Sequence, residues 1–324
     1  MVDKKEKILL GGVWQKIHYR TEDPKRPVLL FLHGGPGVCN RHSIMTHDID
    51  LLDTFTIVTW DQRGTGGSYW GVSQDTLTIE RLTDDAAELV EWLCRKFSKD
   101  KIFVIGGSWG SELGVWLISR YPEKVAALFG FGQVVDIAKN EEISYNYTLK
   151  SAEEAGDTDA VTRLKEVGPP VMGQYKGGFK GMMVQRNLMM RYGGYSKQSG
   201  KDNYWNAMVV PMLTSGEYTL SDIIGLLLGY KKVLKKMWGE LGTTCFPKTC
   251  TKFNTRFYIF DGRLDMNTPS ELVEDWYRSI EATDKELIWF EMSGHNPMGD
   301  EPVKFKKLLR EKCASVIAEE TCTI

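Results

Sequence analysis

A single Gly-x-Ser-x-Gly match, Gly106–Gly110, constrains this chain most, because it joins a strand pattern to a helix pattern. The preceding run, Lys101–Ile105, is short, apolar and rich in β-branched residues, which is typical of a buried parallel strand. The following residues are apolar at helical spacing and end at Tyr121-Pro122. A strand, a sharp turn and a helix would lift the oxygen of Ser108 clear of the sheet, with the positive end of the helix dipole beside it. The pattern predicts a serine nucleophile, and the alternative is a plain glycine-rich turn with a solvated serine.

Histidine is scarce, and this scarcity identifies the expected partners of the serine. Of the five histidines, only His295 follows Ser108, and the α/β-hydrolase fold places its triad in the chain order serine, acid, histidine. His295 is therefore the expected base, with a surface histidine as the alternative. Two candidates for the acid, Asp261 and Asp265, follow the late strand pattern 255–260. We favour Asp265, which lies farther into the loop, and interpret Asp261 as a hydrogen-bond acceptor for the turn.

The negative oxygen that forms during acyl transfer needs hydrogen-bond donors close to the serine. One donor is expected from the backbone N–H of Trp109, directly after the nucleophile. The loop His33-Gly34-Gly35-Pro36-Gly37 combines glycine and proline in a tight path with bare amides. We expect Gly35 to supply the second donor, although the same loop read alone could be any glycine-rich turn.

Strand and helix patterns alternate in both outer parts of the chain, as in an α/β sheet. Between about 134 and 252 strand patterns are absent, and the sequence is rich in Met, Tyr, Lys and Gly. The expected fold is an α/β-hydrolase with a mostly parallel, eight-stranded sheet flanked by helices. Residues 1–133 and 253–324 would form the catalytic domain, and 134–252 a mainly helical cap over the active site.

The composition excludes several classes of protein. The 324 residues carry a formal net charge of −2, which gives no electrostatic reason to expect nucleic acid or a membrane as partner. No segment has the length and apolar character of a signal peptide or a membrane span. The six cysteines show no paired CxxC spacing, so we expect no metal site and a cytoplasmic protein with reduced thiols. Cys39, just past the glycine-rich loop, is either a small buried residue or a thiol that reagents can reach beside the site.

Five sequence blocks together resemble the proline iminopeptidase family of serine peptidases. They are His33–Gly37, Asp61–Ser68, Gly106–Ser111, Gly262–Met266 and Ser293–His295, and they occur in the order of that family. The resemblance implies an α/β-hydrolase with a helical cap, no cofactor, and release of an N-terminal residue, often proline, from short peptides. It also implies that Asp265 is the triad acid and that Asp61 and Arg63 form a structural turn.

The cap pattern departs from that family. Its members bind the free amine of the substrate through cap glutamates, one of them shortly before a Gly-Gly pair. Here Arg186 stands at the matching place before Gly193-Gly194, and a guanidinium would repel an ammonium and attract a carboxylate. We expect Gly34, Arg186 and Glu217 in the substrate-binding part. Glu217 and Glu240 are the alternative amine ligands, although solvated surface charge also explains both.

Three hypotheses follow for the function. The first is a serine hydrolase that cleaves a small peptide or amide through an acyl-enzyme on Ser108. The second is a carboxylesterase or lactonase on the same scaffold, and the third is a non-catalytic binding protein. A small molecule or short peptide is the expected substrate, and the sequence leaves the oligomeric state open.

Overall fold

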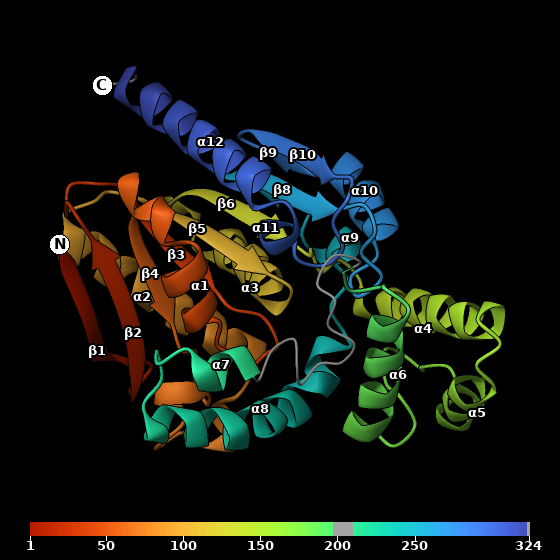
Figure 1. The fold of residues 1–324 in the computed structure, drawn as a ribbon. Coiled ribbons are helices and arrows are strands. Elements are labelled where there is room, and N and C mark those ends of the chain that lie inside the picture. The colour runs from red at the N-terminus through yellow and green to blue at the C-terminus, as the bar shows by residue number, and fades with distance from the viewer. Residues whose placement is uncertain (197–209, 323–324) are drawn as a thin grey trace.

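The computed structural model describes residues 1–196 and 210–322, and its centre is one eight-stranded sheet (Figure 1). The strand order is β1-β2-β4-β3-β5-β6-β8-β10. The first two pairings, β1 with β2 and β2 with β4, are antiparallel, and all the others are parallel. The strands are β1 (Val2–Leu10), β2 (Val13–Thr21), β3 (Val28–Leu32), β4 (Thr56–Trp60), β5 (Ile102–Gly107), β6 (Val125–Phe131), β8 (Arg256–Gly262) and β10 (Lys285–Phe290). The expected fold class and its mostly parallel sheet are confirmed.

Alternating side chains of the central strands fill two separate cores, one on each face of the sheet. In β3, Leu30 and Leu32 belong to one core, whereas Leu29 and Phe31 belong to the other. The first core lies under α2 (Ile79–Phe97), α3 (Trp109–Arg120) and α10 (Ser270–Ser279), and the second under α1 (Arg41–His47) and α12 (Pro302–Cys322). Because both faces are covered, the parallel strands read as continuous apolar runs.

The interval between β6 and β8 holds the described helices of the expected cap. They are α4 (Ile137–Glu154), α5 (Thr158–Val167), α6 (Phe179–Arg191), α7 (Val210–Thr214), α8 (Leu220–Leu241) and α9 (Phe246–Thr249). In Figure 1, α4, α5 and α6 project together to one side of the sheet, whereas α8 runs along the β2 side. At the end of this interval, β7 (Lys252–Phe253) pairs with β9 (Glu281–Ala282), which follows α10. The division into a catalytic domain and a cap remains our prediction.

Helix α8 is held against β2 and α1 by buried ion pairs. Arg41 Nη2 lies 2.9 Å from Asp222 Oδ2, and Lys16 Nζ lies 2.6 Å from the same oxygen. Arg41 also reaches Asp61, which accepts a hydrogen bond from the backbone N–H of Gly67. Asp61 therefore belongs to a structural turn, as the resemblance implied.

The second charged residue of that turn, Arg63, is buried in a bidentate ion pair. Its Nε lies 2.6 Å from Asp85 Oδ2 and its Nη2 lies 2.9 Å from Asp85 Oδ1. Gln15 donates a further hydrogen bond to the same carboxylate. Arg63 thus joins the loop after β4 to α2 and has a structural role.

The buried Arg63–Asp85 pair is expected to stabilise the fold. Replacing Asp85 with Ala leaves the Arg63 guanidinium buried without its counter-charge, so the free energy of unfolding should fall by about 3–5 kcal/mol. Asp84→Ala, one residue earlier and partly exposed, is the control and should cost less than about 1 kcal/mol. Urea unfolding followed by circular dichroism measures both. Equal losses for the two variants would contradict the structural role of the pair.

Candidate active site

Ser108 occupies a strained turn between β5 and α3. Its φ of 56° and ψ of −128° are unusual for a residue with a side chain, and such conformations cost about 1–3 kcal/mol. The turn is this sharp because α3 packs against the end of β3 without a side chain between them. A Cβ atom on Gly110 would lie 2.0 Å from the carbonyl oxygen of Leu32. Only glycine fits there, which explains the last residue of the Gly-x-Ser-x-Gly match.

The loops that follow β8 and β10 bring Asp265 and His295 together. His295 Nδ1 lies 2.8 Å from Asp265 Oδ2, and both side chains are almost fully buried. The backbone N–H groups of Asn267 and Thr268 donate to Asp265 Oδ1, and the Thr268 hydroxyl donates to Oδ2 at 2.6 Å. These donors fix the carboxylate, so it can hold the imidazole in one orientation.

Asp261, the alternative acid, is placed differently. Its Oδ1 accepts a hydrogen bond from the backbone N–H of Gln133 at 3.2 Å, and its other oxygen has no partner among the described residues. Burial and then the nearby charge of Asp265 raise its pKa well above the usual range. Asp261 thus accepts a hydrogen bond near the carboxyl end of β8, while Asp265 is bonded to the histidine.

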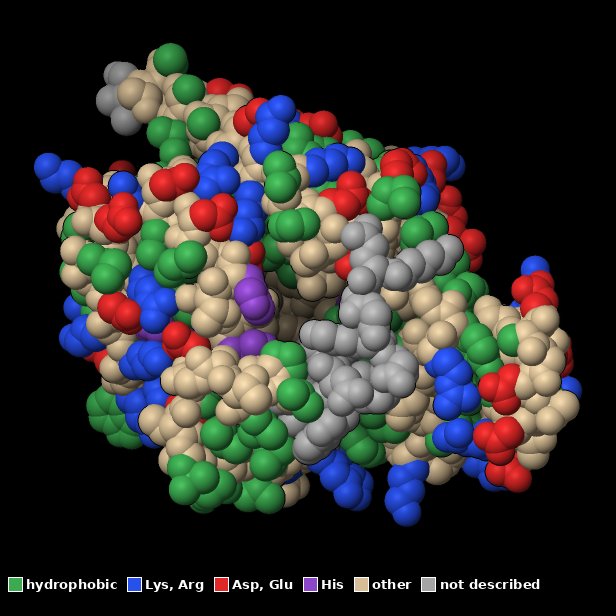
Figure 2. All heavy atoms as spheres, in the orientation of Figure 1, with side chains coloured by type: hydrophobic (Ala, Val, Ile, Leu, Met, Phe, Trp, Pro, Cys, Tyr) green, Lys and Arg blue, Asp and Glu red, His purple; other side chains and the backbone are tan. Residues whose placement is uncertain are grey.

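Ser108 and His295 line one cavity, with a volume of about 910 Å³. Figure 2 shows a hollow on this face of the molecule, with histidine side chains at its rim. Gly34, Gly35 and Trp109 line the same cavity, and a Cβ atom on Gly34 would lie 3.7 Å from Ser108 Oγ. Four of the five residues expected at the centre of the site, together with the expected substrate-binding residue Gly34, therefore line one space. The fifth, Asp265, is fully buried and is joined to the site through its bond to His295. Among the described residues, Ser108 Oγ forms no hydrogen bond with His295. A direct contact between the two groups is therefore part of the mechanism proposed below.

The glycine-rich loop is held in place by a buried network that sequence reasoning missed. His33 Nδ1 donates to the carbonyl of Gly34, and His33 Nε2 accepts from the backbone N–H of Gln62. The Gln62 side chain returns a bond to the His33 carbonyl and accepts one from Trp109 Nε1 at 2.8 Å. Burial lowers the pKa of His33 to about 4, so its ring stays neutral and can accept this bond. The network joins the loop that carries Gly35 to the turn that carries Ser108.

On the cap side, Arg186 lines the cavity as expected, but its charge is already matched. Its Nη2 donates to Glu141 Oε1 and its Nη1 to Gln185 Oε1. Glu141 also lines the cavity, is only 1% exposed, and its Oε2 has no hydrogen-bond partner in the described structure. The expectation that Arg186 presents a free cation therefore needs correction. The unsatisfied atom at this wall is a carboxylate oxygen, and no motif in the sequence indicated it.

The two other candidate amine ligands lie elsewhere. Glu217 is absent from the cavity wall and forms ion pairs with Lys5 at 2.8 Å and Arg20 at 3.2 Å, so it fastens the segment before α8 to β1 and β2. Both oxygens of Glu240 accept from the backbone N–H of Ile79 at the start of α2. Both glutamates therefore have structural contacts, and their assignment as amine ligands loses its basis.

Cys39 is a buried residue behind the glycine-rich loop. It is 1% exposed, and its sulfur lies 3.6 Å from the Thr65 hydroxyl. Burial and the nearby charge of Asp61 raise the pKa of this thiol well above its ordinary value. The small buried residue is thus the better of the two interpretations, and thiol reagents are not expected to act through Cys39.

Comparisons with known proteins agree with this architecture. Residues 27–157 match the family model described as the alpha/beta hydrolase fold. A probable aminopeptidase of Bacillus subtilis, YbaC, is 28% identical over 94% of each chain. The proline iminopeptidase of Neisseria gonorrhoeae is 34% identical, over 33% of this chain and 32% of its own.

Solved structures with this fold include several kinds of hydrolase. The proline iminopeptidase-related protein of Thermus thermophilus has a TM-score of 0.66 at 16% identity, covering 98% of this chain and 99% of that one. An epoxide hydrolase of Bacillus megaterium has a TM-score of 0.59 at 18% identity, covering 94% of this chain and 98% of its own. At these identities the structures show the fold alone. Together, these matches and the sheet show that this chain has the α/β-hydrolase fold and is similar in sequence to a probable aminopeptidase and to proline iminopeptidases.

Proposed function

We propose that the protein is a serine hydrolase that cleaves a small peptide or amide through an acyl-enzyme on Ser108. The observation that carries this proposal is the Asp265–His295 pair, hydrogen-bonded at 2.8 Å on the cavity that Ser108 also lines. A serine on a strained turn, a histidine and an orienting carboxylate at one site form the arrangement that activates a serine hydroxyl.

The mechanism assigns one task to each group. His295 Nε2 takes the proton of the Ser108 hydroxyl while the oxygen attacks the substrate carbonyl, and Asp265 stabilises the charged imidazole through Nδ1–H. The backbone N–H groups of Gly35 and Trp109 bind the negative oxygen of the tetrahedral intermediate. The imidazolium then gives its proton to the leaving amine, and the acyl group stays on Ser108. Water, activated by the same histidine, releases the acid and restores the serine.

Glu141 supports an aminopeptidase type of substrate. A buried carboxylate oxygen without a donor costs about 1–3 kcal/mol, and a ligand that brings a donor recovers this energy. Arg186 forms an ion pair with Glu141, but it bonds to Oε1 and leaves Oε2 for a ligand. An N–H group of the substrate, such as a free amino terminus, matches this oxygen. The full-length similarity to a probable aminopeptidase supports the same assignment.

An esterase or lactonase on the same scaffold is the second candidate. Four methionines, Met182, Met183, Met189 and Met190, line the cap side of the cavity. Their flexible apolar side chains would accept an acyl chain as well as a peptide. Because both candidates use the same catalytic groups, substrates have to separate them.

The nucleophile assignment predicts that Ser108→Ala abolishes turnover of a proline arylamide and of short aryl esters. The loss should be at least about 10³-fold, because the oxyanion donors alone give little rate. Ser119→Ala is the control, since Ser119 lies on the same helix and its hydroxyl bonds, within the described residues, to Val115 and Cys250. Steady-state rates measure the effect. Near-normal activity of the Ser108 variant would refute the assignment of Ser108 as the nucleophile. Activity of the natural chain on esters alone would favour the esterase or lactonase function.

The amine assignment predicts that Glu141→Gln lowers kcat/KM for substrates with a free amino terminus by about ten- to a hundredfold. The variant replaces an ionised acceptor with a neutral one and weakens a charge-assisted hydrogen bond. The same substrates with an acetylated amino group should show much less change. Glu142→Gln, at an exposed neighbouring position, is the control. Equal losses on free and acetylated substrates would remove Glu141 from amine recognition.

A further inference from the structure

One short segment of the insertion is bonded to both loops that carry the expected acid and base. The backbone N–H of Met266, next to Asp265, donates to the Gly194 carbonyl at 2.9 Å. The backbone N–H of His295 donates to the Tyr195 carbonyl at 2.7 Å. The two loops follow different strands of the sheet, so the Gly194–Tyr195 backbone bridges them.

The next residue of this segment extends the bridge. Ser196 Oγ donates to Asp300 Oδ1 at 2.7 Å, and Asp300 Oδ2 accepts from the backbone N–H of Gly294 at 3.1 Å. Gly294 directly precedes His295, and a Cβ atom there would lie 2.1 Å from the Tyr195 carbonyl oxygen. The histidine loop is thus packed against residues 194–196 at backbone distance.

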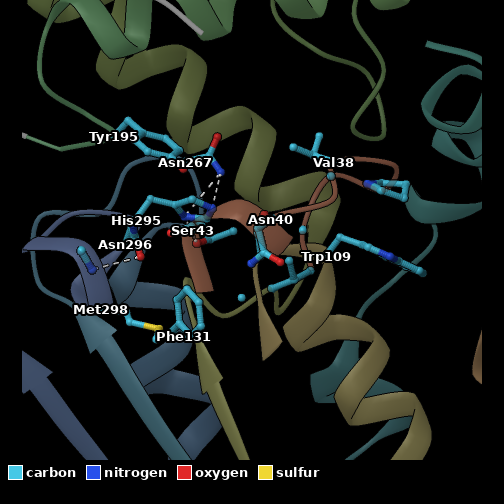
Figure 3. Close-up of a pocket in the computed structure, with 18 of the residues that line it drawn as sticks. Val38, Asn40, Ser43, Trp109, Phe131, Tyr195, Asn267, His295, Asn296 and Met298 are labelled. Carbon is cyan, nitrogen blue, oxygen red and sulfur yellow. Dashed lines mark hydrogen bonds between the residues drawn. The ribbon is translucent and has the colours of Figure 1, made fainter. Parts of the chain in front are cut away.

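The side chain of Tyr195 contacts the imidazole itself. The two ring centroids are 5.0 Å apart at an interplanar angle of 54°, and both side chains line the cavity (Figure 3). Burial and the charges of Asp265 and Asp300 raise the pKa of Tyr195, so the phenol stays uncharged. Its contribution to the histidine is therefore the apolar ring.

Two other neighbours also contact the imidazole. The amide nitrogen of Asn267 lies 3.1 Å from His295 Nε2 and 3.5 Å from Nδ1. Asn267 thus contacts both ring nitrogens, including the one expected to accept the serine proton. Gly132 also lies against the imidazole, since a Cβ atom there would be 2.7 Å from Cε1. Both contacts restrict the position of the ring.

We propose that Tyr195 is a positioning residue that the insertion supplies to the base His295. This inference rests on the proposed serine hydrolase function. The aromatic ring limits rotation of the imidazole and keeps water off one part of it, while the Tyr195 backbone holds the loop. The same stretch of chain begins with α6, which carries Arg186, so the wall beside Glu141 and the position of the base are joined through one segment.

The test compares Tyr195→Ala and Tyr195→Phe, using the proline arylamide or aryl ester that the natural chain turns over. Loss of the ring should lower kcat by about ten- to a hundredfold with little change in KM, because a misplaced base slows chemistry more than binding. The acidic limb of the kcat/KM profile should move to higher pH, since water that reaches the imidazole stabilises its charged form. Tyr195→Phe keeps the ring and should retain most of the rate and the normal profile.

Two further variants keep this test decisive. Tyr192→Ala, which removes a half-buried tyrosine of the same segment that bonds to Asp157, should leave the pH profile unchanged. If Tyr195→Ala fails to fold, as judged by circular dichroism, Tyr195→Leu keeps part of the apolar volume but is smaller than the ring and leaves part of the imidazole open to water. It should show a slower kcat and a profile shifted in the same direction. A natural kcat and profile in a folded Tyr195→Ala or Tyr195→Leu protein would overturn the inference. An active Ser108→Ala protein would instead refute the underlying function, so the two failures are distinguishable.

Discussion

The close packing of α3 against the end of β3 is the constraint on which the site depends. No side chain fits between Gly110 and the Leu32 carbonyl, so the chain turns sharply after β5 and holds Ser108 at positive φ. The continuation of β3 is the glycine-rich loop, and the same contact therefore brings Gly34 beside the serine oxygen. Nucleophile and expected oxyanion donors thus share one backbone contact, which the Gln62 bonds to His33 and Trp109 reinforce.

The parallel sheet and the insertion together position the other groups of the site. Because β8 and β10 are parallel neighbours, their carboxyl ends place the Asp265 and His295 loops at one edge of the sheet. The insertion adds the wall with Glu141 and Arg186 and the contacts of Tyr195 with the histidine loop. Part of the insertion is also anchored by the buried charges of Arg41 and Asp222.

Across the described residues, no helix is long and apolar enough to cross a bilayer.

Much of the catalytic part could be predicted from the sequence, because local patterns determine it. The strand patterns at 101–105 and 255–260 correspond to β5 and β8, since each is a short apolar run ended by turn residues. The place of Asp265 farther into the loop favoured it over Asp261 as the partner of the histidine. Scarcity of histidine and the order of the triad identified His295 itself.

The cap side could not be predicted in the same way, because its contacts join residues that are distant in sequence and follow no period. Glu141 meets Arg186 across two helices, and Glu217 meets the β1–β2 hairpin instead of the cavity. Alignment alone gave Arg186 a free charge, and only its partner in space corrects this. The roles of Tyr195 and Asn267 could not be predicted from the sequence either, because they depend on the imidazole that both residues contact.

Peptide mapping by mass spectrometry after reaction with a fluorophosphonate identifies the nucleophile. We expect a single covalent adduct on the peptide that contains Ser108. We also expect labelling to slow at acidic pH, because a protonated imidazole cannot act as base. A fully active protein that stays unlabelled, or one that is labelled at another residue while Ser108 remains free, would show that Ser108 is not the nucleophile.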